Sequence, residues 1–115
     1  MKTNINPAQY QSEIDKLISF RKLLNSGYLV EIPSELAIDS SLCILNNFIS
    51  KKLLPEKISP MVEGGIIFEF FTGDGYHSIS VYNDSEIIYL KRSNDKTEHV
   101  INNLTASSVG EYIYV

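Results

Sequence analysis

The stretch "MVEGGIIFEFFTGDGYHSISVYNDSEIIYLKR", residues 61–92, decides the fold class of this 115-residue chain. After Gly65 the side chains follow a period of two, which predicts β-strands. Three groups of turn residues interrupt this pattern: Gly73-Asp74-Gly75, Asn83-Asp84-Ser85 and Ser93-Asn94-Asp95. The spacing predicts an antiparallel meander of four strands, near residues 66–71, 76–82, 86–92 and 97–101.

The residues before this stretch follow a helical period instead. Asn6-Pro7 predicts a helix start, because Asn caps well and Pro suits the first helical position. Pro33-Ser34 predicts the start of a second, more buried helix that ends near Lys51-Lys52. The apolar positions that support the first helix are Tyr10, Ile14, Leu17, Ile18 and Leu24, with Gly27 just beyond its end.

After the last strand, Asn103 or Thr105 predicts a short helix that runs through Ser107, Val109 and Tyr112. We therefore expect one α+β domain over residues 1–115. Two N-terminal helices would pack on one face of a four-stranded antiparallel meander, and a short C-terminal helix would follow. The Pro55 to Pro60 stretch is expected to be an extended connection.

Composition limits the classes of partner. Hydrophobic residues make up 43% of the chain, and no apolar run approaches the roughly 20 residues that span a bilayer. The net charge of −4 argues against nucleic acid as the main partner, since phosphate binding needs a concentrated basic face. The N-terminus lacks an apolar signal core, and Cys43 is a single cysteine, so we expect a cytoplasmic protein.

Loop length predicts which residues share a face of the sheet, because side chains alternate. With two-residue loops, Phe70 would lie opposite His77, Tyr82 opposite Ile87, and Arg92 opposite Thr97. One face would then form the core under the helices. Its expected members are Ile66, Phe68, Phe70, Ile79, Val81, Ile88, Leu90 and Ile101.

The other face would carry a row of Glu69, Ser78, Lys91 and Glu98, which is typical of an open antiparallel surface. Glu69 is therefore interpreted as a solvent-side residue near Lys91 and not as a catalytic acid. This face is also rich in aromatic and apolar groups, Val100 among them, which favours a partner site. Alternatively, the predicted C-terminal helix or the chain end 112–115 folds over this face and covers it. The predicted binding residues are Ile67, Glu69, Phe71, Tyr76, Tyr82, Tyr89, Lys91 and Glu98.

The candidate reactive groups favour structural roles. His77 and His99 would lie on the core face of non-adjacent strands without a carboxylate beside them, so we predict neither a metal site nor a cofactor. Cys43 is predicted to be a buried thiol. The glycine pairs lack the lysine and following helix of a phosphate loop. Lys51, Lys52 and Lys57 form a small basic cluster, interpreted as a solvated helix end.

The motif Pro60…Glu63-Gly64-Gly65-Ile66…Phe68-Glu69-Phe70 resembles a pattern in small uncharacterised bacterial proteins, where Trp often replaces Phe70. Such proteins are similar to accessory partners in toxin–antitoxin or mobile-element neighbourhoods of bacteria and phages. The resemblance covers roughly residues 33 to 101, and it implies no catalytic residues.

These observations favour a non-catalytic protein-binding module of the antitoxin, immunity or anti-defence type, which would bind another protein or a second copy of itself. Two alternatives stay open. One is a small hydrolase or lyase that uses His77 with Arg92 in a cleft between helices and sheet. The other is a weak nucleic-acid binder that uses Lys51, Lys52 and Lys57.

Overall fold

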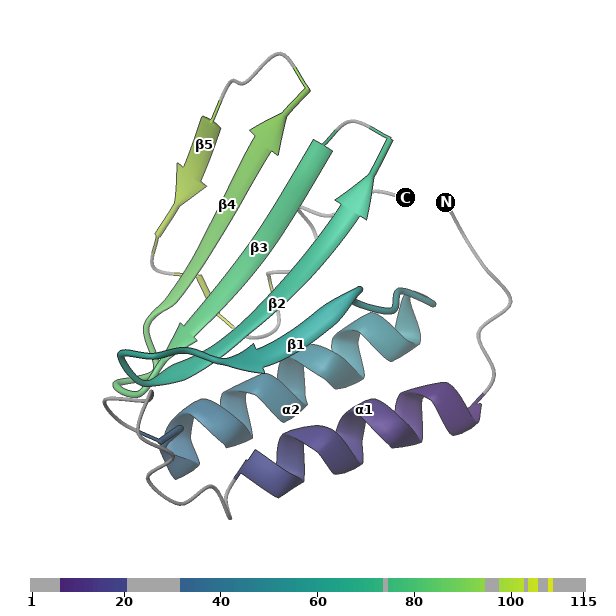
Figure 1. The fold of residues 1–115 in the computed structure, drawn as a ribbon, viewed down its shortest axis with the longest axis vertical. Helices are drawn as coiled ribbons and strands as arrows, with labels where there is room; N and C mark the ends of the chain where they lie inside the picture. Colours follow the sequence, from purple (N-terminus) through teal and green to yellow (C-terminus); the bar gives the residue numbers. More distant parts are fainter. Residues whose placement is uncertain are drawn as a thin grey trace.

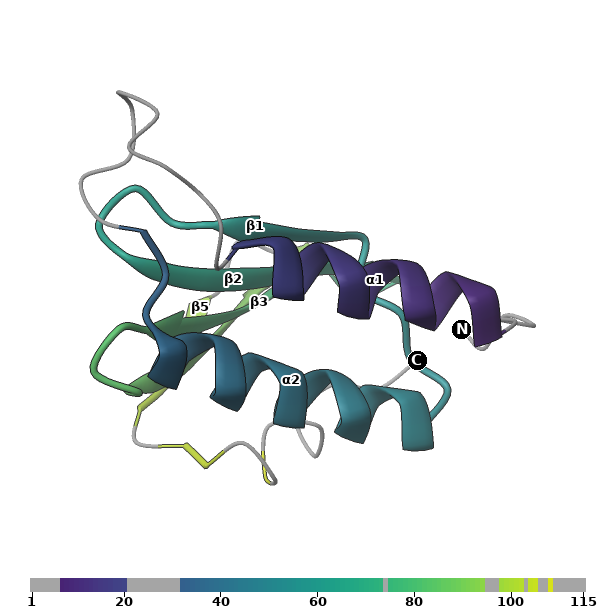
Figure 2. The same ribbon diagram turned by 90° about the horizontal axis from the view of Figure 1, so that it is seen from below.

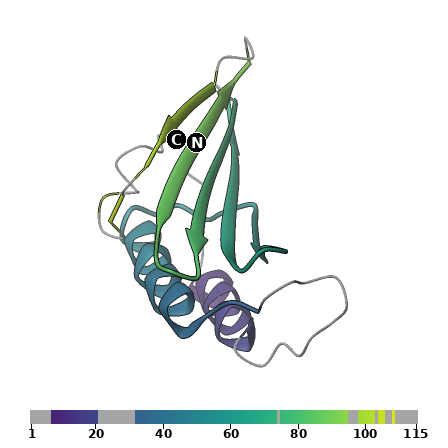
Figure 3. The same ribbon diagram turned by 90° about the vertical axis from the view of Figure 1, so that its left-hand side faces the viewer.

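The computed structural model describes residues 7–20, 32–73, 75–94, 98–102, 104, 105 and 108. Its elements are α1 (Pro7–Ser19), α2 (Glu35–Ser50), β1 (Lys57–Pro60), β2 (Gly65–Thr72), β3 (Gly75–Tyr82), β4 (Ile87–Ser93) and β5 (Glu98–Ile101). The strands form one antiparallel sheet in the order β1-β2-β3-β4-β5. Both helices lie on the same side of this sheet (Figures 1 and 3), so the α+β prediction is confirmed.

The sheet has five strands, and the prediction of four was wrong. The additional strand, β1, pairs with β2 so that Lys57 lies opposite Glu69 and Pro60 opposite Ile66. Its four residues end on a proline, which reads in sequence as a connection. An edge strand tolerates proline because one side of its backbone needs no partner.

The predicted C-terminal helix falls largely outside the described residues. Where that segment is described, Leu104 and Thr105 are not helical, and Ser108 closes a turn with a hydrogen bond to the Thr105 carbonyl at 3.0 Å. Leu104 packs against the hydrophobic core. The expected extension of the first helix to Leu24 also lies outside the described residues, and α1 ends at Ser19.

Ser34 caps the N-terminus of α2, as predicted, and also ties it to the sheet. Its Oγ accepts a hydrogen bond from the N–H of Ala37 at 3.1 Å and donates one to the carbonyl of Asn83 at 2.9 Å. The Asn83 Oδ1 accepts from the N–H of Ser34 at 2.7 Å, and its Nδ2 donates to the Ile32 carbonyl at 3.0 Å. The β3–β4 loop and the start of α2 are therefore one hydrogen-bonded unit.

The core lies between α2 and the central strands, with α1 packed beside α2 (Figure 2). Phe48 of α2 makes edge-to-face contacts with Phe68 and Phe70, at centroid distances of 5.8 Å and 5.0 Å. Cys43 is exposed, so the prediction of a buried thiol was wrong. The buried residues of α2 recur at helical spacing and bypass it: Ala37, Ile38, Ser41, Ile44, Leu45 and Phe48.

The register of β2 and β3 is the predicted one, with Phe70 opposite His77 across a two-residue loop. Gly65 begins β2 at φ 115°, where a Cβ would overlap the Val81 carbonyl oxygen, so glycine is required there.

Within the described residues, neither helix has the length and apolar character needed to cross a membrane.

The register of β4 differs from the prediction by one residue. Ile87 lies opposite Val81 and not Tyr82, because three residues, 83–85, close the loop. The Tyr82 N–H donates to the Glu86 carbonyl at 2.9 Å, and Ser85 adopts the left-handed conformation at φ 72°. This matches the three-residue hairpin loop that ends on a left-handed residue. Each β4 side chain therefore lies on the face opposite to the predicted one.

The register of β5 is also displaced by one, since Arg92 lies opposite Glu98 and not Thr97. Two displacements of one residue restore the original alternation. Glu98 and Val100 consequently lie on the predicted face, and Ile101 lies on the core side.

Candidate functional site

The side of the sheet away from the helices is the candidate site, and we call it the outer face. Figures 1 and 3 show both helices together on one side of the sheet, below its strands in these views. Among the described residues, no helix packs on the outer face. The register assigns to it Lys57, Ser59, Ile67, Glu69, Phe71, Tyr76, Ser78, Ser80, Tyr82, Ile88, Leu90, Arg92, Glu98 and Val100.

Six of the eight predicted binding residues lie on the outer face: Ile67, Glu69, Phe71, Tyr76, Tyr82 and Glu98. Tyr89 and Lys91 do not, and their assignment was wrong. Tyr89 is only 3% exposed and belongs to the core, while Lys91 is half-buried on the same side. The cause is the three-residue β3–β4 loop, which reverses the faces of β4.

The outer-face residues that the prediction missed are Ile88, Leu90 and Arg92 of β4, and Lys57 and Ser59 of the unpredicted strand β1. Ile88 and Leu90 were assigned to the core, but both are half-buried on the outer face, beside Ser80 and Ser78 of β3. A run of three turn residues does not distinguish the two loop lengths, because Gly73-Asp74-Gly75 closes as a two-residue loop and Asn83-Asp84-Ser85 as a three-residue loop. The predicted row of Glu69, Ser78, Lys91 and Glu98 is replaced by Lys57, Glu69, Ser78, Leu90 and Val100.

An aromatic and charged row crosses the outer face near the β2–β3 turn. Phe71, Tyr76, Arg92 and Glu98 lie opposite one another on four successive strands. The Phe71 and Tyr76 rings are 5.3 Å apart and tilted by 56°, and Phe71 is 63% exposed. Arg92 donates to Glu98 Oε1 from Nε at 3.1 Å and from Nη2 at 2.7 Å. This ion pair is exposed to solvent, so it contributes little to the free energy of folding. Its main effect is to fix the orientation of the two side chains.

The hydroxyl of Tyr76 donates a hydrogen bond to Glu69 Oε2 at 2.7 Å. Partial burial, followed by this bond and the negative charge of Glu69, raises the pKa of Tyr76 to about 12. Glu69 is half-buried on the outer face, and its carboxylate accepts the hydrogen bond from Tyr76. The predicted contact with Lys91 does not form, because Lys91 lies on the opposite face of the sheet. The basic residue opposite Glu69 in register is Lys57 of β1.

An aliphatic patch lies beside the aromatic row. It consists of Ile67, Ile88, Leu90 and Val100, and Val100 is 53% exposed on the edge strand. Together the row and the patch form a mixed surface, in which Ser78 and Ser80 of β3 lie between the apolar groups of β2 and those of β4. Surfaces of this composition occur where proteins bind one another.

The alternative His77–Arg92 site is not formed. His77 is 1% exposed on the core side, with Nε2 at 2.9 Å from Thr72 Oγ1 and Nδ1 at 2.7 Å from Tyr89 Oη. Arg92 lies on the outer face and pairs with Glu98. His77 is thus a buried histidine with partners at both ring nitrogens, as polar groups in protein cores generally are. His99 shares the core side but is exposed near the end of the sheet.

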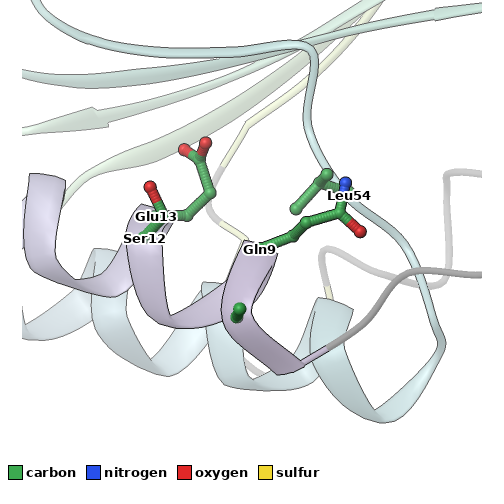
Figure 4. A pocket seen from close by; sticks show the side chains of 5 residues that line it. Gln9, Ser12, Glu13 and Leu54 are labelled. Carbon is green, nitrogen blue, oxygen red and sulfur yellow. The ribbon is translucent and has the colours of Figure 1, made fainter.

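A surface depression of about 350 Å³ lies between α1 and the chain after α2 (Figure 4). The described residues that line it are Ala8, Gln9, Ser12, Glu13 and Leu54, and Glu13 is the one titratable side chain among them. In the described part of the chain, no three His, Cys, Asp or Glu side chains are grouped so that they could hold a metal ion. Acid–base chemistry needs converging groups, so we assign no reaction to this depression.

The chain was also compared with known proteins. No protein-family model, no curated protein and no solved structure matches it. The inference about function therefore rests on the chain's own surfaces. Among these, the outer face carries exposed apolar and aromatic side chains, Phe71 and Val100 among them.

Proposed function

We propose that the chain is a non-catalytic protein-binding module that acts through its outer face. The observation that carries the proposal is the aromatic pair on that face, the exposed Phe71 with its ring tilted against that of Tyr76, with the Ile67, Ile88, Leu90 and Val100 patch next to it. Exposed apolar surface is normally limited on a soluble domain, and a contiguous patch with a polar margin marks an interaction site.

The roles of the residues follow from their exposure and bonding. Phe71 is the anchor, because it is the most exposed large hydrophobic side chain on this face and can fill a pocket in a partner. Tyr76 is held by Glu69, so its ring is already positioned and little side-chain entropy is lost on binding. The Arg92–Glu98 pair lies beside this anchor and orients a partner of complementary charge.

The kind of partner is proposed from the resemblance of the Gly-Gly strand motif. It suggests a toxin, an effector or a defence component, which an antitoxin, immunity or anti-defence protein would bind in the cytoplasm. The geometry of the outer face supports the binding step and leaves the partner to experiment.

The test compares two substitutions that place the same charge on equally exposed apolar positions. Phe71→Lys alters the outer face, and Leu36→Lys alters α2, where Leu36 is 59% exposed. Each purified variant is immobilised and exposed to host lysate, and captured proteins are identified by mass spectrometry. The binding of a captured protein is then measured with purified components by isothermal titration calorimetry.

We expect Leu36→Lys to bind like the wild type and Phe71→Lys to bind about 30-fold or more weakly, the effect of losing an interface hot spot. Unchanged melting temperatures would show that both variants are folded. A partner that Phe71→Lys retains at full affinity would show that another surface binds it.

A further inference from the structure

The two edges of the sheet differ in the backbone groups that they present. In an antiparallel sheet, successive residues of a strand direct their N–H and C=O groups to opposite neighbours. The Tyr82 N–H bonds to the Glu86 carbonyl, so even-numbered residues of β4 face β3 and odd-numbered ones face β5. With Tyr89 opposite Ile101 and Lys91 opposite His99, the backbones of Glu98 and Val100 point away from the sheet.

The β1 edge is closed by its own residues. The Met61 N–H bonds to the Gly65 carbonyl, so the outward-directed positions of β1 are Ile58 and Pro60. Ile58 is 1% exposed, and Pro60 has no N–H to donate. Proline and coverage are the usual means of protecting a sheet edge.

Among the described residues, neither kind of protection is present at the β5 edge. Glu98, His99 and Val100 are all exposed, and no described segment pairs with the outward side of β5. Leu104, which follows β5, donates its N–H to the Ile87 carbonyl at 3.3 Å and packs on the core, away from this edge. An unpaired edge of this kind is a template for another strand.

We propose that the β5 edge pairs with the β5 edge of a second copy of the chain, antiparallel about a twofold axis, to form one continuous ten-stranded sheet. Only residues that point outward, Glu98, Val100 and Asn102, can form the hydrogen bonds, so the axis lies between Glu98 and Asn102. An axis at Glu98 would place two carboxylates opposite each other, and like charges in those positions repel. An axis at His99 would place the Glu98 carboxylate opposite the apolar Val100 of the copy, and one at Ile101 would place Val100 opposite the polar Asn102.

An axis at Val100 has no such conflict. It places Val100 opposite its own copy, Glu98 opposite Asn102, and His99 opposite Ile101 of the second copy. The cross-strand row Leu90–Val100 then continues into Val100 and Leu90 of the copy, which buries the exposed Val100 side chain. Because the paired segment is short, the buried area is small and the dimer is weak and concentration-dependent. The twofold arrangement is the commonest one in homo-oligomers.

The test is sedimentation equilibrium of the full chain over the micromolar to millimolar range. Val100→Pro removes the outward N–H, which no other described strand uses, and edge strands tolerate proline there. Val100→Thr is the matched control, because it keeps both the N–H and the branched shape. We expect the wild type and Val100→Thr to dimerise with similar Kd values and Val100→Pro to stay monomeric.

Val100→Lys is a second variant that tests the same edge if the proline variant does not fold. Two ammonium groups would face each other across the axis, and we expect the dimer Kd to rise at least about tenfold with an unchanged melting temperature. Phe71→Lys should dimerise like the wild type, which separates this proposal from the outer-face function. A wild type that is monomeric throughout, or a folded Val100→Pro that dimerises normally, would overturn the proposal. So would capture of a host protein that depends on the Val100 N–H in a monomeric chain, since the edge would then pair with that protein.

Discussion

Tyr89 and Leu90 are neighbours on β4, yet their side chains lie on opposite faces of the sheet. Tyr89 is buried under the helices with its hydroxyl on His77, whereas Leu90 lies half-buried on the outer face beside Val100. Both residues are apolar, so neither identity nor alternation of polarity distinguishes their faces. In a strand that is apolar on both sides, the length of the preceding loop, and not the composition, decides which side chains lie on which face of the sheet.

The largest expected effect comes from placing a lysine at each of these two positions. Tyr89→Lys would bury an unpaired charge and remove the hydroxyl partner of His77, so we expect a loss of at least about 3 kcal/mol in the free energy of unfolding. Leu90→Lys should lose only about 1 kcal/mol, because the ammonium group can reach water. Urea unfolding followed by circular dichroism measures both values. Equal losses would contradict the assigned faces.

A smaller effect is expected at the loop that assigns those faces. Ser85 holds φ 72°, a conformation that costs a residue with a Cβ more than glycine. Ser85→Gly should therefore raise the free energy of unfolding by about 0.5–1 kcal/mol, and Ser85→Val should lower it by about 1–2 kcal/mol. The same urea titrations test this, with Ser80→Gly as a control in a strand, where we expect a loss. A stabilising Ser85→Val would mean that the loop closes differently.

The smallest expected effect concerns the pH dependence of the outer face. The pKa of Tyr76 is raised from 10.0 to about 12 in the folded chain, so the folded state favours the protonated phenol. Its contribution to stability is complete below pH 10 and is lost as the pH rises toward 12. Wild type should therefore lose more stability over this window than Tyr76→Phe, as pH-dependent unfolding would show. Tyr82→Phe is the control on the same face, and an equal change in that variant would assign the effect elsewhere.

Much of the fold was predictable from local sequence patterns. A two-residue loop, assumed for every turn, is correct at residues 73–74, and the predicted pairing of Phe70 with His77 is confirmed. Ser34 was recognised as the start of α2 because its side chain caps the helix locally. The faces of Glu98 and Val100 were also correct, although only because the β3–β4 and β4–β5 loops each add one residue.

The remaining errors arise where a long-range contact decides between local alternatives. Asn83 is hydrogen-bonded to Ser34, which lies 49 residues away, and Ser85 adopts the left-handed conformation two residues later. No local rule predicts the hydrogen bonds between Asn83 and Ser34. β1 was missed because Pro60 disfavours a strand unless the strand lies at an edge. Cys43 was assigned to the core because the apolar stripe of α2 is broad, and Ser41 occupies the buried position instead.

The bond between Asn83 and Ser34 also has a consequence for the order of folding. The start of α2 cannot acquire its final environment until the β3–β4 hairpin, far along the chain, has closed around residues 83–85. Opening of that loop and fraying of the helix start should therefore be one cooperative event. The N–H of Ala37, which the Ser34 cap protects, becomes a reporter of hairpin opening in hydrogen exchange, although it lies in a different element of the fold.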